Sequence, residues 1–557
     1  MRMEKYVIGV DFGTLSGRAA VVSVRDGREL AHAVYDYPHG VMDRAIPTGR
    51  TLPPDWALQH PADWLEVLQH VIPEAIRLSG VAPEDLIGIG VDATACTVLP
   101  VKADGTPLCF LPEYRDVPHA YAKLWKHHGA QEEAERLNRI AAERGEAFLP
   151  RYGGKLSSES MIPKIWHTLN EAPEIYETAD YFIEAADWIV WQLTGVLSRN
   201  ACAAGYKSMW SKKDGYPDPS FFRALDPRLE RVAADKLAGP VVPIASRVGG
   251  VTKEAAALTG LPEGIAVAAG TVDAHVAVPT ANIDGPGKLL AIIGTSTCHM
   301  ILSQDEPRVP GICGYSEDGL MPGYFGYEAG QTCVGDHFAW FVENGVPAAY
   351  KTAAEAEGLS IHQYLTKLAE AYSPGQSGLL ALDWWNGNRS ILVDMDLTGM
   401  FLGMTLQTKP EELYRALIEA TAYGTRMIVE NYRAHGVAVK ECYATGGISR
   451  KNPMMMQIYA DVLNMPVYLT ETTQCGALGS AIMASVAAGS KAGGYPDLFA
   501  ASAAMGKVSP TPYLPDAGRA AIYDALYQEY ARLHEYFGRD NHVMKRLKQL
   551  KYRQLTE

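Results

Sequence analysis

Two short turns in the sequence combine a glycine with a hydroxyl side chain directly after an apolar run. Gly13 and Thr14 follow residues 6–12, and Gly294 and Thr295 follow residues 288–293. Glycine lets a backbone amide approach a phosphate oxygen, and threonine adds a short hydroxyl donor. One such turn alone is better explained as hairpin geometry. The matched pair, about half the chain length apart, indicates two turns that grip one polyphosphate from both sides of a cleft.

Two carboxylates lie in positions that suit phosphate chemistry. Asp11 ends the strand pattern before the first turn, where it could hold a hydrated Mg²⁺ beside the phosphates. Asp273 follows the small residues 268–271, and a carboxylate near an alcohol can accept its proton during phosphoryl transfer. Asp273 is therefore the candidate base. The alternative for Asp273 is a helix N-cap, and His275 beside it is interpreted as a packing residue.

Two charged residues stand among aromatic neighbours. Lys207 lies in the segment Gly-Tyr-Lys-Ser-Met-Trp, and Glu328 lies in Phe-Gly-Tyr-Glu-Ala-Gly-Gln. A lysine between aromatic residues is usually a surface residue that keeps its amine in water, and such a glutamate is usually paired. Either could instead bind sugar hydroxyls, which aromatic faces and charged hydrogen-bonding groups suit.

A pair of glycines precedes a helix in the second half of the chain. Gly446 and Gly447 come before the helical pattern of residues 454–463, so a flat ring could lie against the backbone there. The sequence contains no GxxxxGK[ST] loop, no GxGxxG after a strand, no HExxH and no GxSxG. ATP stays possible, because backbone amides in paired turns can also hold its phosphates.

The elements that must position these residues occur twice. Residues 6–10, 18–24 and 29–35 predict an antiparallel meander, which a helix over 62–78 and a strand over 87–92 follow. A second hairpin around Gly294, a helix over 411–435 and a strand ending near Gly446 repeat this order. We expect two domains built on one ancestral plan, covering residues 1–283 and 284–557, with residues 103–250 as an elaboration of the first.

Composition narrows the class of protein. The chain has 557 residues, 47% of them hydrophobic and 20% charged, with a formal net charge of −14. These values favour a globular protein with a large core and disfavour nucleic acid or an anionic membrane as a partner. Eight cysteines without a CxxC pair predict free thiols in a reducing cytoplasm. No signal peptide and no membrane span is expected.

Five motifs in order resemble those of the FGGY carbohydrate kinases. They are Val10 to Thr14, Val91 to Thr94, Gly270 to Asp273, Ile293 to Ser296 and Ala444 to Gly447. The resemblance implies an α/β fold, namely the two-domain, duplicated actin/hexokinase-like (ribonuclease H-like) ATPase core with insertions. It also implies a kinase that uses ATP and Mg²⁺, and a homodimer is possible.

Segments around Lys207, Asp273 and Glu328 are most similar to family members that phosphorylate L-ribulose. The implied reaction converts L-ribulose to L-ribulose 5-phosphate in L-arabinose catabolism. Other ketoses (D-ribulose, L-rhamnulose or D-xylulose) remain alternatives, and a non-catalytic ATPase-core switch protein is a further one. Glycerol-type members carry an Arg-Glu pair where this chain has Thr94 and Ala95, so the resemblance disfavours glycerol.

The same resemblance assigns roles to individual residues. Asp273 is the implied base and also contacts the ketose, together with Lys207, Glu328 and the backbone near Ala95. For the nucleotide and its ion, the implied residues are Asp11 for Mg²⁺ through water, Gly13, Thr14, Gly294 and Thr295 for the phosphates, Gly446 and Gly447 for the adenosine, and Asn452 for the adenine.

Overall fold

The computed structural model describes residues 4–472 and 474–556. Contacts divide the chain into two compact units. Unit 1 comprises Met1–Asp284, Tyr315–Gly326 and Gln474–Lys507, and unit 2 comprises Gly285–Gly314, Tyr327–Thr473 and Val508–Glu557. The contacts thus group two later segments of the chain with unit 1. The division of the sequence into two domains, residues 1–283 and 284–557, stays a prediction.

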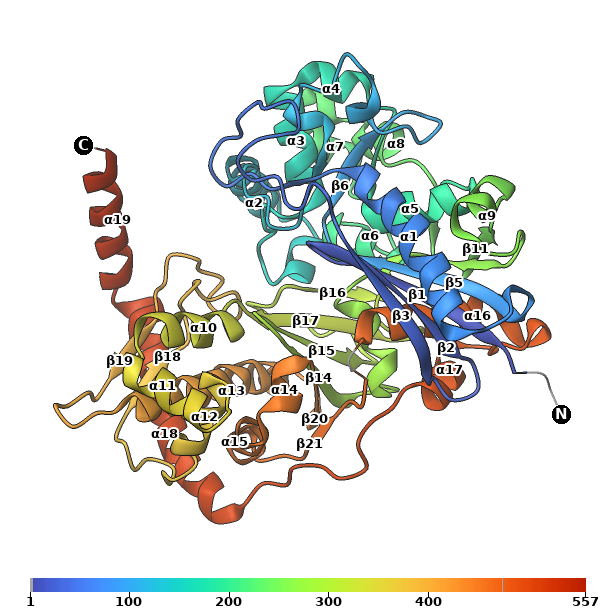
Figure 1. Ribbon diagram of the computed structural model, residues 1–557. Helices are drawn as coiled ribbons and strands as arrows, with labels where there is room; N and C mark the ends of the chain where they lie inside the picture. The colour runs from blue at the N-terminus through green and yellow to red at the C-terminus, as the bar shows by residue number, and fades with distance from the viewer. Residues whose placement is uncertain (1–3, 473, 557) are drawn as a thin grey trace. The chain divides into compact units, whose positions relative to one another are not determined.

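Unit 1 is built on a mixed sheet with the order β11-β12-β5-β1-β2-β3, in which β13 also pairs with β5 (Figure 1). The strands are β1 (Tyr6–Phe12), β2 (Ser16–Ser23), β3 (Glu29–Asp36), β5 (Leu86–Ala93), β11 (Arg247–Gly250), β12 (Ala266–Ala268) and β13 (Thr271–Val272). The pairs β1–β2 and β2–β3 are antiparallel, which confirms the predicted meander. Strand β5 runs parallel to β1 and β12.

Helices cover both faces of this sheet. They are α1 (Pro61–Ser79), α5 (Ala185–Thr194), α9 (Lys253–Thr259), α16 (Cys475–Ala492) and α17 (Leu498–Met505). Alternate residues of a strand point to opposite faces. Ile8 and Val10 therefore join Trp64 of α1 in one core, while the intervening Gly9 faces α16. A Cβ at Gly9 would overlap the carbonyl of Ala477, so glycine is what lets α16 approach the sheet this closely.

Residues between β5 and β11, together with residues 42–58, form a second hydrophobic core around Trp166 and Tyr121. The helices here are α2 (Gln131–Arg144), α3 (Met161–Glu171), α4 (Pro173–Thr178), α6 (Ala201–Lys207), α7 (Pro219–Leu225) and α8 (Val232–Lys236). A small sheet, β4-β7-β6-β8, consists of Leu58–Gln59, Ala122–Lys123, Val98–Val101 and Tyr181–Glu184, and β9 (Arg199–Asn200) pairs with β10 (Val241–Val242). The predicted elaboration of the first domain is therefore an α-helical subdomain with its own core.

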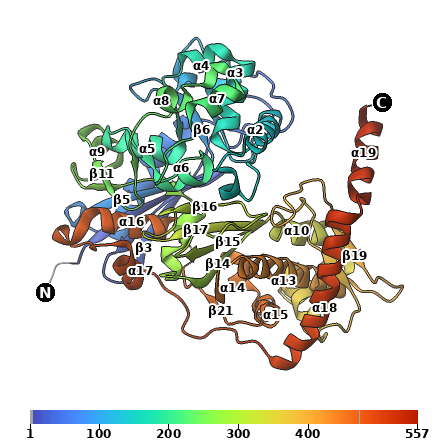
Figure 2. The same ribbon diagram turned by 180° about the vertical axis from the view of Figure 1, so that it is seen from behind.

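Unit 2 repeats the strand order of unit 1. In its sheet, β17-β15-β14-β20-β21 are neighbours in that order, as Figure 2 shows from behind. The strands are β14 (Gly287–Ile293), β15 (Thr297–Ser303), β17 (Phe325–Gln331), β20 (Val439–Thr445) and β21 (Val467–Leu469). β14 is antiparallel to β15 and parallel to β20, just as β1 is antiparallel to β2 and parallel to β5. The predicted internal repeat is thus confirmed.

The helices of unit 2 include two that match the predicted ranges closely, α13 (Pro410–Ala434) and α15 (Pro453–Leu463). The others are α10 (Gly335–Asn344), α11 (Ala348–Ala356), α12 (Ile361–Ala369), α14 (Gly447–Lys451), α18 (Ala517–Glu535) and α19 (Val543–Thr556), and the remaining strands are β18 (Leu380–Leu382) and β19 (Met400–Leu402). Of β16 (Gly314–Glu317), residues 315–317 group with unit 1. None of the eight cysteines forms a disulfide bond within the part of the chain that the structure describes, as predicted.

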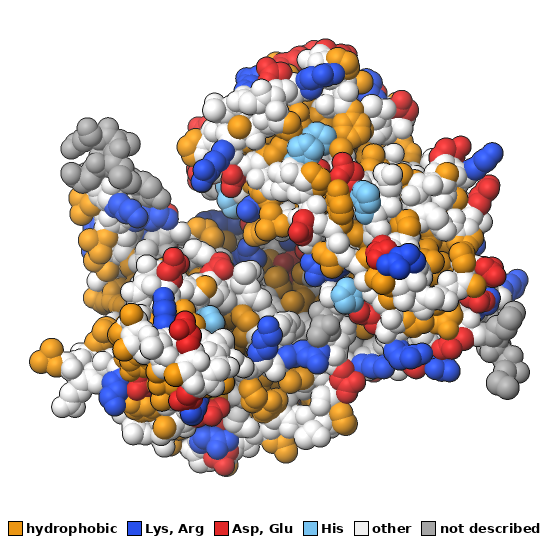
Figure 3. All heavy atoms as spheres, viewed as in Figure 1, with side chains coloured by type: hydrophobic (Ala, Val, Ile, Leu, Met, Phe, Trp, Pro, Cys, Tyr) orange, Lys and Arg blue, Asp and Glu red, His pale blue; other side chains and the backbone are white. Residues whose placement is uncertain are grey.

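Surface charge is mixed in sign. Lys and Arg side chains alternate with Asp and Glu over the face seen in Figure 3. Among the helices that the structure describes, none is both long enough and apolar enough to cross a bilayer.

Candidate active site

Two carboxylates lie next to each other at the carboxyl ends of parallel strands in unit 1. Asp11 on β1 and Asp92 on β5 are register partners, and both share their strand face with glycines that abut α16. The hydroxyl of Ser480, on α16, donates to Asp92 Oδ2 at 2.6 Å. Parallel strands bring their carboxyl ends to one edge, which is where ligands usually bind in α/β sheets.

The N-terminal turn of α16 is placed directly against Asp11. A Cβ built on Gly476 would lie 2.7 Å from Asp11 Cγ, closer than any side chain can approach. The N-terminus of a helix carries a partial positive charge from its unpaired amides, which favours a negative group nearby. Glycine at position 476 therefore allows a contact that both positions Asp11 and stabilises its anionic form.

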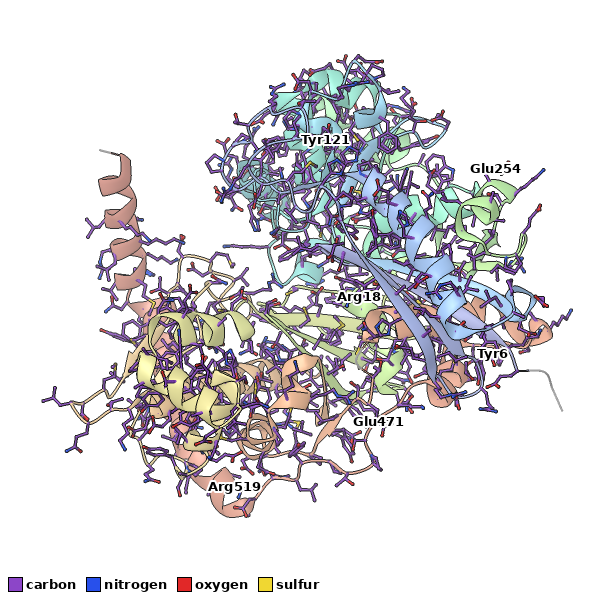
Figure 4. The ribbon with its side chains drawn as sticks, viewed as in Figure 1. Tyr6, Arg18, Tyr121, Glu254, Glu471 and Arg519 are labelled. Atoms are coloured by element: carbon purple, nitrogen blue, oxygen red, sulfur yellow. The ribbon has the colours of Figure 1, made fainter. Side chains whose placement is uncertain are left out.

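The charge state of the pair follows from its surroundings. Burial raises the pKa of Asp11, and the opposing effects of Arg18 and of a hydrogen bond with Asp92 offset this rise only in part. Arg18 Nε, on β2 (Figure 4), lies 3.5 Å from Asp11 Oδ2. Burial first, and then the charge of Asp11, raise the pKa of Asp92 well above its ordinary value. Of the two carboxyl groups, Asp92 is therefore the one that more readily keeps a proton.

A proton on Asp92 has an evident acceptor. Asp92 Oδ1 is buried and has no hydrogen-bond partner of its own among the described residues, so its proton can be directed to Asp11. Asp92 lies within one of the five motifs, but the sequence alone predicts no role for it. Asp92 ends a predicted strand just as Asp11 does, and this shared position is the sequence feature that could have indicated its role.

Asp273 comes to the same edge of the sheet. It directly follows β13, whose residues Thr271 and Val272 pair with Asp92 and Ala93. The Asp273 amide donates to the Ala93 carbonyl at 3.0 Å, and Asp273 Oδ1 accepts from the Ala274 amide at 2.7 Å. The charge of Asp273 also raises the pKa of Asp92. Asp11, Asp92 and Asp273 thus form one carboxylate cluster, although they come from three separate parts of the sequence.

The helix-cap alternative for Asp273 is not realised. The short 3₁₀ helix that follows it, His275–Ala277, has Ala274 as its N-cap residue and no side-chain cap. His275 is buried, its Nδ1 lies 3.0 Å from Cys202 Sγ and its ring packs 4.3 Å from that of Tyr206. The interpretation of His275 as a packing residue is confirmed.

Ala95 and Lys207 lie in one region of unit 1. Ala95 is in the turn after β5, where the amide of Thr94 donates to the Phe12 carbonyl at 3.1 Å. Lys207 is the last residue of α6 and is half-buried, and its charge acts on the thiol of Cys96 next to Ala95. Lys207 is therefore not a solvent-directed surface lysine, and it lies near the turn in which a ketose contact is expected.

The first glycine–threonine turn is the three-residue loop between β1 and β2. The Gly13 amide donates to the Ser16 carbonyl at 3.0 Å, and the Gln59 side chain donates to the Thr14 carbonyl at 2.8 Å. The indole of Trp125 donates to Thr14 Oγ1 at 3.1 Å. Because this hydroxyl accepts from Trp125, its own hydrogen can be donated to a ligand oxygen.

The second turn has the same design in unit 2. It is the three-residue loop between β14 and β15, and the Gly294 amide donates to the Ser296 carbonyl at 2.9 Å. The Gly335 and Val334 amides donate to the carbonyls of Gly294 and Thr295 at 2.9 and 2.8 Å. The Thr295 side chain is exposed. The backbone of this turn is therefore fixed while its hydroxyl is accessible.

Gly446 and Gly447 differ in what surrounds them. Gly446 has φ 105° and packs so tightly on Ile293 that a Cβ would overlap the Ile293 carbonyl. A Cβ at Gly447 would meet nothing within 4 Å among the described residues. Gly446 thus holds the turn against the sheet, and Gly447 offers open space beside the backbone in which a flat ring could lie.

Two expected ligand contacts of unit 2 receive no direct geometric support. Asn452 is the N-cap of α15: its Oδ1 accepts from the Met455 amide at 3.0 Å, and its Nδ2 donates to the Thr366 hydroxyl at 3.3 Å. Glu328 is buried on β17, and its carbonyl accepts from the Cys313 amide at 2.9 Å. Both assigned roles stay predictions. The capping of α15 is sufficient to explain an asparagine at position 452 without a contact to adenine.

Comparison with known proteins covers nearly the whole chain. Residues 6–279 match the N-terminal domain of the FGGY family of carbohydrate kinases, and residues 289–488 match the C-terminal domain. A protein named "Ribulokinase" from Geobacillus thermodenitrificans is 58% identical over 550 residues, which cover 98% of this chain and 97% of that protein. One of the same name from Mycolicibacterium smegmatis is 50% identical over 547 residues, covering 98% and 96%.

Solved structures with low sequence identity share the fold. A xylulose kinase from Rhodospirillum rubrum superposes with a TM-score of 0.77 at 24% identity, covering 96% of this chain and 99% of that one. A Plasmodium falciparum glycerol kinase with ADP gives a TM-score of 0.73 at 15% identity, covering 95% and 98%. The expected α/β two-domain fold is thereby confirmed.

Proposed function

The chain belongs to the FGGY family of carbohydrate kinases, and on that premise we propose that it transfers the γ-phosphoryl group of ATP to the 5-hydroxyl of L-ribulose. The products are L-ribulose 5-phosphate and ADP, and the reaction serves L-arabinose catabolism in the cytoplasm. The observation that carries the chemistry is the convergence of Asp273 with Asp11 at one strand edge, beside the Gly13–Thr14 turn. The choice of ribulose rests on the names of relatives that are 50% to 58% identical.

Asp273 is the proposed base. Its carboxylate accepts the proton of the sugar hydroxyl as the oxygen attacks the γ-phosphorus, and ADP departs. A carboxylate lowers the barrier to phosphoryl transfer only if it is held within hydrogen-bond reach of the sugar hydroxyl. The Ala274 amide, at 2.7 Å from Oδ1, contributes to that hold.

The residues around Asp11 fit a hydrated Mg²⁺. Mg²⁺ prefers oxygen ligands and keeps several waters, so one anionic carboxylate at an open strand edge is a suitable anchor. Asp92, as the protonated neighbour, leaves that single negative charge on Asp11. When bound, the ion would neutralise charge on the phosphates; Asp11 would orient it through water.

The remaining assignments follow the two units. In unit 1, Ala95 and Lys207 would contact the ketose, and Gly13 and Thr14 the phosphates. In unit 2, Gly294 and Thr295 would bind phosphate, and Gly446 and Gly447 would border the adenosine. Glu328 as a ketose contact, Asn452 as an adenine contact and a homodimer remain proposals from family resemblance.

ADP release on addition of single sugars tests the function. The four 2-ketopentoses and L-rhamnulose, each with ATP and Mg²⁺, should rank with L-ribulose highest in kcat/KM. A higher kcat/KM with another ketose would identify that ketose as the substrate, and the reaction would still be ATP-dependent phosphorylation of a sugar. ATP hydrolysis of equal rate with and without sugar would instead favour a switch protein on the same core.

A further inference from the structure

A cluster of two histidines and a glutamate lies in the subdomain core of unit 1, apart from the carboxylate edge. His119 lies in a 3₁₀ turn, Pro118–Ala120, and His167 and Glu171 lie on α3. Tyr121, labelled in Figure 4, follows His119 by two residues and marks this part of the unit. His167 and Glu171 are four residues apart, so they project from the same side of the helix.

The three side chains converge on one point. His119 Nε2 lies 3.1 Å from Glu171 Oε2, and His167 Nε2 lies 3.1 Å from Glu171 Oε1. The three ligand atoms all lie within 4.8 Å of one another. Ligand atoms bound to tetrahedral Zn²⁺ at about 2.0–2.2 Å are about 3.4 Å apart, so small side-chain shifts would close this set around an ion.

Ring orientation separates this cluster from a second candidate. The planes of the His119 and His167 rings are inclined at 67° to each other. A single ion can therefore lie in the planes of both rings. The rings of His39 and His60 near Asp63 are stacked at 15° with centroids 4.3 Å apart. Planes this close to parallel intersect only well beyond the rings, whereas an ion lies in the plane of each imidazole that binds it.

Burial keeps the imidazoles in the form that binds metal. The side chains of His119 and His167 are 6% and 3% exposed, whereas that of Glu171 is 54% exposed and gives an ion access from solvent. A buried imidazole favours the neutral ring, which is the form that binds a metal ion. Nδ1 of each ring has no hydrogen-bond partner among the described residues, so the proton can move there and free the Nε2 lone pair.

A neighbouring lysine does not exclude the ion. Lys123 is buried and its Nζ donates to the Thr168 hydroxyl at 2.6 Å. Burial lowers the pKa of Lys123 to about 7, so near neutral pH the amine is deprotonated in a large share of molecules.

We propose that His119, His167 and Glu171 form a binding site for a divalent transition-metal ion of the Zn²⁺ type, with water as the fourth ligand. Two imidazoles and one carboxylate are donors that suit Zn²⁺, Co²⁺ and Ni²⁺ better than Mg²⁺. The site is independent of the kinase reaction. A bound ion would tie the Pro118–Ala120 turn to the C-terminal end of α3.

Titration of the EDTA-treated full chain with Co²⁺ in excess Mg²⁺ tests the site. One equivalent should bind with the intense visible absorption of four-coordinate Co²⁺, and Zn²⁺ should displace it. Glu171→Gln and His167→Gln should each weaken binding at least about ten-fold, and His39→Gln should bind like the parent. Zn²⁺ should raise the Tm of the parent and of His39→Gln more than that of the two cluster variants.

Several outcomes would overturn the proposal. The first is that no stoichiometric Co²⁺ binds to the parent, and the second is that Glu171→Gln binds Co²⁺ with unchanged affinity. The third is that only His39→Gln loses binding, which would place the ion at His39 and His60. Glu171 is half-exposed, so its variant should fold even if a variant of the buried His167 does not. Circular dichroism in EDTA verifies folding of each variant.

Discussion

Asp11 and Asp92 are register partners on adjacent parallel strands, and the hydroxyl of Ser480 donates to the second of them at 2.6 Å. Two buried carboxyl groups this close cannot both be ionised at moderate cost. Burial and the charge of Asp11 raise the pKa of Asp92, so Asp92 acts as a hydrogen-bond donor that fixes an anionic Asp11. A buried acid thereby positions the carboxylate that is proposed to hold Mg²⁺, without any charge of its own.

Substitutions of Asp92 test whether this residue acts on Asp11 as a neutral hydrogen-bond donor or as an ionised carboxylate. Asp92→Asn keeps a donor for Asp11 and an acceptor for Ser480, so kcat and the Mg²⁺ requirement should stay within a few-fold of the parent. Asp92→Ala removes both and should lower kcat at least about ten-fold, with a loss of about 1–3 kcal/mol in the free energy of unfolding. Steady-state kinetics over a Mg²⁺ series and urea unfolding measure these effects. Equal impairment in both variants would mean that Asp92 acts as an ionised group.

Gly476→Ala tests the close contact between α16 and Asp11. The new Cβ would lie 2.7 Å from Asp11 Cγ, so the carboxylate or the helix must move. A displacement of this kind at a reacting centre can cost about 100-fold in rate. We expect a large fall in kcat and a higher Mg²⁺ requirement. The exposed Ser490→Ala in the same helix is the control, and parent-like kinetics in Gly476→Ala would remove the contact from the mechanism.

The parts that sequence could predict are those governed by local pattern. The hairpins around Gly13 and Gly294 and the helices α1, α13 and α15 follow from alternation and helical periodicity over short windows. Ser480 is 388 residues from Asp92, and Gly476 meets Asp11 from the far end of the chain. No local pattern encodes such contacts, because they arise only when α16 packs on the sheet of unit 1.

Thr295→Val tests phosphate binding by the second turn. The Thr295 side chain is exposed and the turn is held by backbone hydrogen bonds, so the change removes a hydroxyl while preserving the fold. The KM for ATP should rise about five- to ten-fold, which corresponds to roughly 1–1.4 kcal/mol for one hydrogen bond, and the KM for sugar should change little. Initial-rate kinetics with each substrate varied will show this. A larger effect on sugar than on ATP would contradict the assignment.

Acid should destabilise unit 2 through His299. This residue is fully buried on β15, its Nε2 lies 3.2 Å from the Thr425 hydroxyl, and burial lowers its pKa to about 3. The unfolded state, with a pKa of about 6.5, therefore binds more protons between these values, so the free energy of unfolding falls as pH falls. From pH 7 to pH 5 the parent should lose about 2 kcal/mol more than His299→Gln, measured by urea unfolding.

An exposed histidine provides the control for that comparison. His32→Gln, which replaces an exposed side chain, should show the same pH dependence as the parent. If His299→Gln and the parent lose equal stability on acidification, His299 is not the group responsible.

Asp273→Asn should separate sugar binding from turnover. Asparagine retains an oxygen that can accept from the Ala274 amide, so the loop after β13 should keep its conformation. It cannot accept the proton of the sugar hydroxyl, and loss of a general base typically costs about 100- to 10,000-fold in rate. Calorimetry should give a ketose Kd within a few-fold of the parent, while ADP release should fall by at least 100-fold. Turnover close to that of the parent would remove Asp273 from its role as base, and a large loss of ketose affinity would make it a binding residue instead.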